Sequence, residues 1–298
     1  MKPTVIPLPG NAAIAHSLAE ILDANVGACE IRRFPDGESY VRLDTAVEAH
    51  HVILVCSLDR PDEKFLSLTF AAKTARDLGA TSIGLVCPYL AYMRQDACFH
   101  PGEAISAKYF GAALGQYIDW LVTVDPHLHR LNSLNDIFAI PTTAVHAAPL
   151  MSEWIRAHVR NPILIGPDSE SEQWVASVAA GAGAPYAVLQ KSRRGDRDVS
   201  ISTLGAKVDV ERVPVLVDDI ISTAGTMIEA IHHLRDVCSK PPICVGVHAV
   251  FAENAYAALR AAGASQVVTC NAIAHDSNAI DLSSPIADAV GKFLSQMS

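Results

Sequence analysis

The sequence predicts an α/β protein of two domains, each built on a mainly parallel sheet flanked by helices. At 298 residues the chain is long for a single hydrophobic core, and two domains of ~150 residues are the usual solution. Short apolar runs alternate with amphipathic stretches along the whole chain, as in parallel α/β folds. The runs are apolar at nearly every position, which is typical of strands buried on both faces of a sheet.

The predicted strands and helices follow one another in alternation. Strands are predicted at residues 52–55, 83–86, 120–124, 163–165, 215–217 and 245–247. Amphipathic helices are predicted at residues 65–78, 175–182 and 226–234. In the last of these, Met227, Ile228, Ile231 and Leu234 recur at helical spacing, so one face of the helix is apolar.

A domain boundary is predicted within residues 141–150, where Pro141 and Pro149 flank a segment of low charge. Because short linkers of this kind commonly separate domains, the expected domains are residues 1–145 and 146–298. The C-terminal tail is expected to be able to pack back on the first domain.

Composition and charge exclude several classes of function. The net charge of −9 argues against sequence-independent binding of nucleic acid, which needs lysine and arginine to neutralise phosphates. No apolar stretch approaches the ~18–20 residues of a membrane span, and the N-terminus has no signal-peptide pattern. The 7 cysteines are scattered without a Cys-x-x-Cys pair, as expected in a reducing compartment. We therefore expect a cytoplasmic protein with no nucleic-acid or membrane partner.

The strand predicted at residues 215–217 is followed by two carboxylates, Asp218 and Asp219, and then by a loop of small and hydroxyl residues. That loop consists of Ser222, Thr223, Ala224, Gly225 and Thr226. Ligands of open parallel sheets bind beyond the carboxyl ends of the strands, and the amides at a helix N-terminus favour an anion. Adjacent carboxylates would face hydroxyl donors or a magnesium ion. A ligand with a phosphate at one end and vicinal hydroxyls at the other, such as ribose 5-phosphate, fits this pattern.

An alternative interpretation of the same loop is simple helix capping. Ser222 or Thr223 would then be the N-cap residue, and the two aspartates would be solvated turn residues. The order of strand, carboxylate pair and loop favours the ligand site over this alternative.

Residues 215–226 resemble the ribose-phosphate binding loop of the type I phosphoribosyltransferase fold. Further segments, in order along nearly the whole chain, resemble the ribose-phosphate pyrophosphokinases, at residues 32–42, 88–96, 101–108, 124–127, 166–168 and 190–193. The run at residues 99–106 is similar to archaeal-type members. The resemblance implies two phosphoribosyltransferase-like domains. It also implies magnesium-dependent transfer of the diphosphoryl group of ATP to the anomeric hydroxyl of ribose 5-phosphate, giving AMP and 5-phosphoribosyl 1-diphosphate.

The resemblance also implies where ATP binds. Two segments of the N-terminal half would contact the nucleotide, through Phe34, Asp36, Gly37, Glu38, Arg94 and Gln95. The first segment would form a hairpin that reaches across a subunit interface to the adenine of a neighbour's ATP, so a homo-oligomer of at least two chains is expected. Without the resemblance, residues 34–38 predict a turn in which Gly37 supplies the bend, and Arg94 is a solvated loop residue.

Metal binding and catalysis are implied in the same way. His127, which would also contact ATP, and Asp168 would hold Mg²⁺, and the loop at residues 167–171 would hold the pyrophosphate being moved. His127 and His129 have a spacing that can suggest zinc, but no other His or Cys cluster has metal-binding spacing, so a structural zinc site is not expected. Lys191 and Arg193 would stabilise the transition state, with Arg193 also contacting ribose 5-phosphate.

The polar stretch at residues 192–198 lacks apolar residues and predicts a mobile loop between two strands. Asp218 and Asp219 would orient the ribose hydroxyls directly or through a second magnesium ion. The loop at residues 222–226 would hold the 5-phosphate.

Two other functions remain open at this stage. A base phosphoribosyltransferase shares the carboxylate pair and loop, but it would not need the nucleotide segments around Phe34 and Arg94. A non-catalytic regulatory relative would be expected to lose the catalytic cations or metal ligands, whereas all of them are present: Lys191, Arg193, His127 and Asp168. The chain has no P-loop and no dinucleotide-binding glycine motif.

Overall fold

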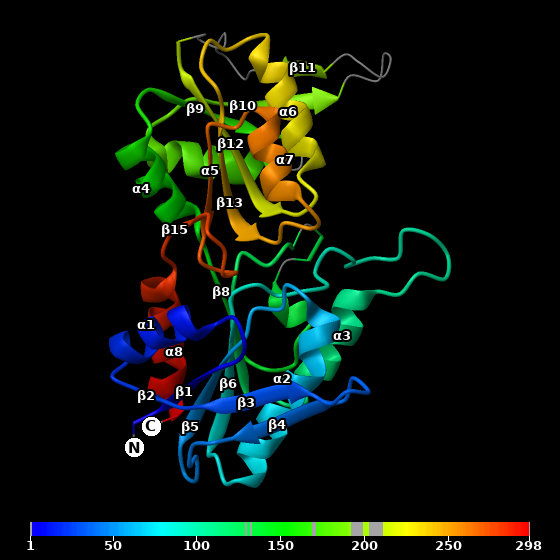
Figure 1. The fold of residues 1–298 in the computed structure, drawn as a ribbon, viewed down its shortest axis with the longest axis vertical. Helices are drawn as coiled ribbons and strands as arrows, with labels where there is room; N and C mark the ends of the chain where they lie inside the picture. Colours follow the sequence, from blue (N-terminus) through cyan, green and yellow to red (C-terminus); the bar gives the residue numbers. More distant parts are fainter. Residues whose placement is uncertain are drawn as a thin grey trace. The chain divides into compact units, whose positions relative to one another are not determined.

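The structure, a computed structural model, describes residues 2–128, 130–131, 133–168, 171–191, 199–202 and 211–297, with only the backbone described at residues 190, 191 and 199–202. It divides into two compact units (Figure 1). Unit 1 comprises Met1–Val145, Ala272–Ala274 and Leu282–Ser298, and unit 2 comprises His146–Asn271 and His275–Asp281. The chain therefore enters unit 2 after Val145 and returns to unit 1 near its C-terminus.

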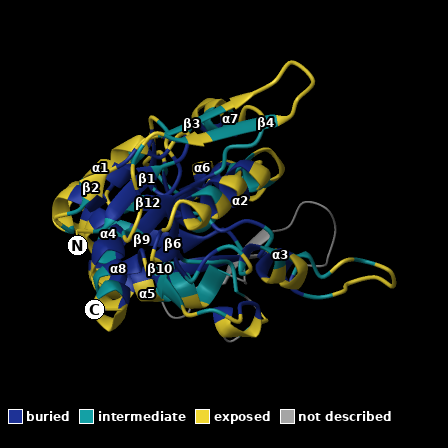
Figure 2. Ribbon diagram, turned by 90° about the horizontal axis from the view of Figure 1, so that it is seen from below, coloured by how far each residue is buried: buried dark blue, intermediate teal, exposed yellow. Residues whose placement is uncertain are grey.

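Unit 1 contains a six-stranded sheet in which all neighbouring strands are parallel. Across the sheet the strands are β2 (Asn25–Val26), β1 (Thr4–Pro7), β5 (His51–Val55), β6 (Ser82–Cys87), β7 (Trp120–Val124) and β8 (Thr142–Val145). A separate antiparallel hairpin is formed by β3 (Cys29–Arg33) and β4 (Ser39–Leu43). The hairpin ends in an exposed turn, whereas the central strands β1, β5, β6 and β7 of the sheet are largely buried (Figure 2).

The helices of unit 1 cover both faces of its sheet. They are α1 (Ala12–Ile21), α2 (Pro61–Asp77), α3 (Ser106–Leu114) and α8 (Ser283–Met297), and a short 3₁₀ helix, η1, spans Leu134–Asp136. Helices α1 and α8 pack together on one face, and α2 and α3 lie on the other (Figure 1). The apolar residues of α2 and α3 pack with those of the strands into one buried core.

Helix α8 is held to the sheet of unit 1 by an aromatic stack. The ring of Trp120 on β7 lies 5.0 Å from the ring of Phe293 on α8, with 13° between their planes. The tryptophan also covers Gly84 on the neighbouring strand, where an added Cβ would lie 1.9 Å from the indole Cζ2 atom. Gly84 thus makes room for the ring that anchors the C-terminal helix.

Replacing Phe293 with alanine should destabilise unit 1 by about 3–5 kcal/mol, because it removes a buried ring and leaves a cavity beside Trp120. Urea unfolding followed by tryptophan fluorescence measures the change. Met297→Ala on the same helix is the matched control, because this exposed side chain should contribute within about 0.5 kcal/mol. Equal effects of the two substitutions would show that α8 is not anchored through Phe293.

Unit 2 contains a seven-stranded sheet whose neighbouring strands are parallel, except for the edge pair β10–β11. Across the sheet the strands are β11 (Val199–Ser202), β10 (Tyr186–Lys191), β9 (Pro162–Gly166), β12 (Val213–Ile221), β13 (Ile243–Ala249), β14 (Gln266–Cys270) and β15 (Asn278–Ile280). The helices are α4 (Ala148–His158), α5 (Glu172–Ala182), α6 (Gly225–Arg235) and α7 (Ala255–Ala262). Helices α4 and α5 pack together, as do α6 and α7. The predicted α/β class with mainly parallel sheets is confirmed.

The prediction that the strand before the carboxylate pair ends at Val217 is wrong. Strand β12 continues through Asp218 and Asp219 to Ile221, because its backbone stays paired with β13 as far as Ile221↔Ala249. Its pairing with β9 on the other side ends earlier, at Leu216↔Ile165. Both aspartates therefore lie beyond the end of β9 although they belong to a strand.

Each sheet has one pair of neighbouring strands from which the chain continues to opposite sides. In unit 1 the chain continues from β1 to β2 on one side and from β5 to β6 on the other. In unit 2 it continues from β9 to β10 on one side and from β12 to β13 on the other. Ligands of open α/β sheets bind beyond the carboxyl ends of the strands at such switch points.

None of the helices in the described part of the chain combines the length and the apolar character that crossing a membrane requires.

Candidate functional site

The switch point of unit 2 brings three carboxylates into electrostatic contact. Asp168 follows β9, and Asp218 and Asp219 lie on β12. Burial first, and then the negative charges of Asp219 and Asp168, raise the pKa of Asp218 well above its ordinary value. The Asp219 amide donates a hydrogen bond of 3.0 Å to Asp218 Oδ1. This group of carboxylates favours a cation or hydroxyl donors beside it.

Asp168 also organises the start of helix α5. Its Oδ1 atom accepts a hydrogen bond of 3.1 Å from the Ser171 amide, and its backbone carbonyl accepts one of 2.6 Å from the Ser171 hydroxyl. The loop at residues 167–171, predicted to hold the pyrophosphate, includes Ser169 and Glu170, which lie outside the described residues. The part that is described fixes the carboxylate at the carboxyl end of β9.

The loop at residues 222–226, predicted to bind an anion, is largely exposed at the start of α6. Ala224 is the N-cap residue, with φ of 60° and ψ of 11°, and it makes no side-chain capping bond. The first amides of a helix have no acceptor within the helix, so they remain available to a ligand. Thr223, Gly225 and Thr226 are exposed, and a Cβ at Gly225 would have its nearest neighbour, Thr223 Oγ1, at 4.0 Å. The alternative in which Ser222 or Thr223 is the N-cap residue is therefore wrong.

The donor set of unit 2 suits magnesium. Mg²⁺ prefers oxygen ligands, keeps several waters and needs only one or two protein carboxylates. Asp168, Asp218 and Asp219 supply such oxygens, and their mutual repulsion would be relieved by a divalent cation. Across the described ranges, no three His, Cys, Asp or Glu side chains converge into a preformed metal cage. Water-rich coordination of magnesium by these carboxylates stays a prediction.

His127 lies in unit 1, in the loop that follows β7. The chain turns there at Asp125, which has a positive φ of 33° and whose amide donates to the carbonyl of Val145. His127 and Asp168 belong to different units, and their joint binding of magnesium stays a prediction.

The loop after β6 holds Arg94 and Gln95. The Gln95 side-chain oxygen accepts a hydrogen bond of 3.1 Å from Ser106 at the start of α3. Because the oxygen is engaged by Ser106, the side-chain NH₂ group of Gln95 is the group available to a ligand. Arg94 is exposed, and within the described part of the chain it makes no ion pair or hydrogen bond. An exposed guanidinium beside an oriented amide is able to bind a nucleotide.

One residue of this region was missed by the sequence analysis. Arg130 Nη1 forms an ion pair of 2.9 Å with Asp96, whose side chain is only 2% exposed. The same guanidinium lies over the ring of Phe99 at 4.7 Å. Arg130 thus holds the loop that carries Arg94 and Gln95. No local pattern marks it, because the fold brings its partners together across a long stretch of sequence.

The tip of the β3–β4 hairpin carries the other residues predicted to contact ATP. The predicted turn is confirmed: Gly37 has φ of 94°, and the amide of Phe34 donates to the carbonyl of Glu38 at 2.8 Å. Asp36 accepts a bond of 3.2 Å from the Glu38 amide. The Phe34 ring is 40% exposed, and the Arg32 guanidinium lies 4.7 Å from its centre. An aromatic face and two carboxylates therefore share one exposed turn.

The predicted catalytic cations are only partly within the described chain. Lys191 is the last residue of β10, and its backbone pairs with Val199 of β11. Arg193 and the predicted mobile loop at residues 192–198 lie outside the described residues.

Comparison with known proteins covers nearly the whole chain. A family described as the N-terminal domain of ribose phosphate pyrophosphokinase matches residues 4–116, and the phosphoribosyl transferase domain family matches residues 133–285. The ribose-phosphate pyrophosphokinase of Methanopyrus kandleri is 34% identical over 93% of this chain and 94% of its own length. That of Methanosarcina acetivorans is 32% identical over 96% of this chain and 98% of its own length.

A solved structure shares the fold. The crystal structure of phosphoribosylpyrophosphate synthetase from Mycobacterium smegmatis superimposes with a TM-score of 0.85 at 23% identity, over 99% of this chain and 100% of that one. Sequence and fold agree over the full length, and the chain belongs to the ribose-phosphate pyrophosphokinase family.

Proposed function

We propose that this chain is a ribose-phosphate diphosphokinase, which transfers the diphosphoryl group of ATP to ribose 5-phosphate. The products are AMP and 5-phosphoribosyl 1-diphosphate. One observation carries the proposal: the largely exposed loop at residues 222–226, which gives α6 no side-chain capping bond, is separated by two residues from the carboxylates of Asp218 and Asp219. A sugar phosphate presents the matching groups, because its phosphate needs amide donors and its hydroxyls need acceptors.

Ribose 5-phosphate would bind with its phosphate at the start of α6. The amides of the first turn and the hydroxyls of Ser222, Thr223 and Thr226 donate to the phosphate oxygens. The helix dipole adds a favourable interaction with the negative charge. Asp218 and Asp219 accept hydrogen bonds from the ribose hydroxyls, directly or through a second magnesium ion. This fixes the anomeric carbon at the carboxyl edge of the sheet.

Transfer requires charge neutralisation more than proton chemistry. The anomeric oxygen attacks the β-phosphorus of ATP in line, and AMP leaves. Magnesium, held by Asp168 and His127 together with water, would neutralise the charge of the diphosphate. Lys191 and Arg193 stabilise the charge that develops on the transferring group, and Arg94 and Gln95 hold the nucleotide.

A homo-oligomer is part of the proposal, with a neighbour's hairpin completing the ATP site. Unit 1 has an exposed apolar patch on α2 and α3, in which Leu66 is 55% and Tyr109 is 64% exposed. Both side chains also line a cavity of about 420 Å³, whose full lining is Asp62, Phe65, Leu66, Tyr92, Ser106, Tyr109 and Phe110. Exposed apolar patches of this kind commonly mark protein interfaces, and the Phe34 turn is likewise uncovered.

Phe34→Ala and Glu38→Ala should each raise the KM for ATP, with Phe34→Ala raising it by about 10-fold, because stacking on a base is worth ~1–3 kcal/mol. Steady-state kinetics at saturating ribose 5-phosphate measure the change. Glu20→Ala, which removes an exposed carboxylate on α1, is the control and should leave the KM unchanged. An unaltered KM in both hairpin variants would refute the adenine clamp.

The anion loop is equally compatible with a base phosphoribosyltransferase, so the two reactions need a direct comparison. The chain is incubated with ATP and ribose 5-phosphate in one assay, and with adenine and 5-phosphoribosyl 1-diphosphate in another. Chromatography of the nucleotides should show AMP formed from ATP only when ribose 5-phosphate is present. AMP formed from adenine would instead assign the chain to the base transferases.

A further inference from the structure

Unit 1 contains a second cavity, of about 250 Å³, at its own switch point. We call it the β1–β5 cavity, because it lies beyond the carboxyl ends of these two strands. It is lined by Leu8, Pro9, Ile31, Arg32, Arg33, Cys56, Glu63, Lys64 and Ser67. None of these residues belongs to the site proposed above.

The β1–β5 cavity has the same position in the sheet of unit 1 as the anion loop has in the sheet of unit 2. In both units a parallel strand at the switch point, β5 or β12, leads through a short loop into the next helix, α2 or α6. The loop in unit 1 differs chemically, because Cys56 and Ser57 follow β5 where unit 2 continues into its carboxylate pair. Ligands commonly bind at this position of an open α/β sheet, but here the hydrogen-bond donors for a ligand must come from groups other than a loop like residues 222–226.

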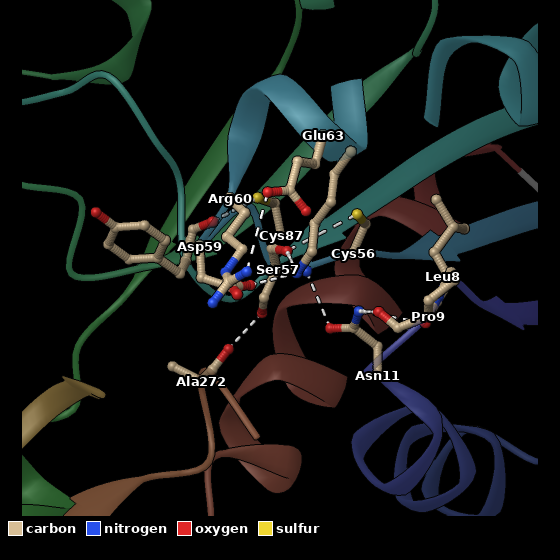
Figure 3. A network of polar contacts seen from close by, with 12 residues as sticks. Leu8, Pro9, Asn11, Cys56, Ser57, Asp59, Arg60, Glu63, Cys87 and Ala272 are labelled. Carbon is tan, nitrogen blue, oxygen red and sulfur yellow. Dashed lines mark hydrogen bonds and ion pairs between the residues drawn. The ribbon is translucent and has the colours of Figure 1, made fainter. Parts of the chain in front are cut away.

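Hydrogen bonds to other segments of unit 1 hold the loop after β5 in place (Figure 3). The amide of Ser57 donates to Asn11 Oδ1 at 2.9 Å, and its hydroxyl donates to the carbonyl of Ala272. Lys64 donates to the carbonyl of Ser57 at 2.9 Å and pairs with Asp59. The wall of the cavity is thus fixed in place before any ligand binds.

Three cations and one carboxylate line the cavity. Arg33 Nη2 donates to the backbone carbonyl of Glu63 at 3.0 Å, and among the described residues Arg33 has no acidic partner. The Glu63 carboxylate lies 3.9 Å from the guanidinium of Arg60, a residue that does not line the cavity. A guanidinium held through one terminal nitrogen, whose other N–H groups have no partner among the described residues, matches the oxygens of a phosphate.

The other part of the lining is apolar. Leu8 and Cys56 are buried, and burial raises the pKa of the Cys56 thiol to about 12, so that it stays neutral. A cavity of this size, below the ~300 Å³ of drug-sized sites, admits a phosphate with a few carbon atoms. We propose that the β1–β5 cavity binds a small organic phosphate monoester, with Arg33 as its main phosphate ligand.

Calorimetric titration of the full-length chain with glycerol 3-phosphate tests this site. Arg33→Gln should weaken binding by about 10-fold or more, because a charge-assisted hydrogen bond is lost. Arg60→Gln makes the same change of charge at an exposed position outside the cavity and should leave the affinity unaltered. The melting temperature of each variant verifies that it is folded.

The same titration on Gly225→Ala separates this cavity from the anion loop of unit 2. Binding that survives Gly225→Ala and is lost in Arg33→Gln supports the β1–β5 cavity. Binding lost in Gly225→Ala and kept in Arg33→Gln would overturn it, as would equal weakening by Arg33→Gln and Arg60→Gln or no binding to the unsubstituted chain. Glycerate, which lacks the phosphate, should bind at least 10-fold more weakly, and equal affinity would overturn the phosphate assignment.

Discussion

Replacing Lys191 with alanine should lower kcat by about 10²- to 10³-fold and leave the melting temperature unchanged. Lys191 ends β10, which is parallel to β9, as is β12. The carboxyl ends of these strands share one edge of the sheet, so the backbone of Lys191 lies at the edge that carries Asp168. A cation at this edge is positioned to meet the charge that develops during diphosphoryl transfer.

Steady-state kinetics with both substrates test this prediction. Lys240→Ala is the matched control, because Lys240 is an exposed lysine of unit 2 whose one side-chain partner among the described residues is the carbonyl of Glu211. Its kcat should remain within about 2-fold of the unsubstituted chain. A change in KM without a change in kcat for Lys191→Ala would mean that Lys191 binds substrate without stabilising the transition state.

Replacing Gly225 with alanine should lower kcat/KM for ribose 5-phosphate by about 10²-fold without loss of stability. Within the described part of the chain, the added Cβ has its nearest neighbour at 4.0 Å, so the fold accepts it. It would project into the space above the first amides of α6, where the phosphate must approach the backbone closely. We therefore expect the substitution to weaken the use of ribose 5-phosphate while the stability of the fold is kept.

Gly291→Ala is the matched control for this helix substitution. Gly291 lies in α8, and apart from its chain neighbours and the backbone of the helix no described residue lies within 4 Å of an added Cβ there. Alanine should stabilise the helix by about 0.5–1 kcal/mol and leave the kinetics unaltered. If Gly225→Ala also left kcat/KM unaltered, the loop at residues 222–226 would not be the phosphate site.

The parts of the fold that follow from local pattern could be predicted from the sequence. Strands buried on both faces are apolar at nearly every position, which is why β5, β6, β7 and β13 were recognisable. The order of carboxylate pair, loop and helix is also local, and it indicated an anion site. Even there, the end of β12 was placed too early, because pairing with β13 depends on the backbone and not on side-chain polarity.

The features that depend on distant segments could not be predicted. The conformation of Ala224 is one, because an alanine with positive φ is set by the packing of the loop and not by its own preference. The stack of Trp120 on Phe293 and the pairing of Asp96 with Arg130 join segments far apart in the sequence. The β1–β5 cavity is another, since its lining comes from several separate stretches of the chain.

Phosphorus NMR of the purified chain with ATP, ribose 5-phosphate and magnesium tests the proposed reaction most directly. The ATP resonances should be replaced by those of AMP and of a sugar-linked diphosphate, and Lys191→Ala should suppress this conversion. ATP left intact by a chain that still binds ribose 5-phosphate would contradict the account and indicate a non-catalytic regulatory relative.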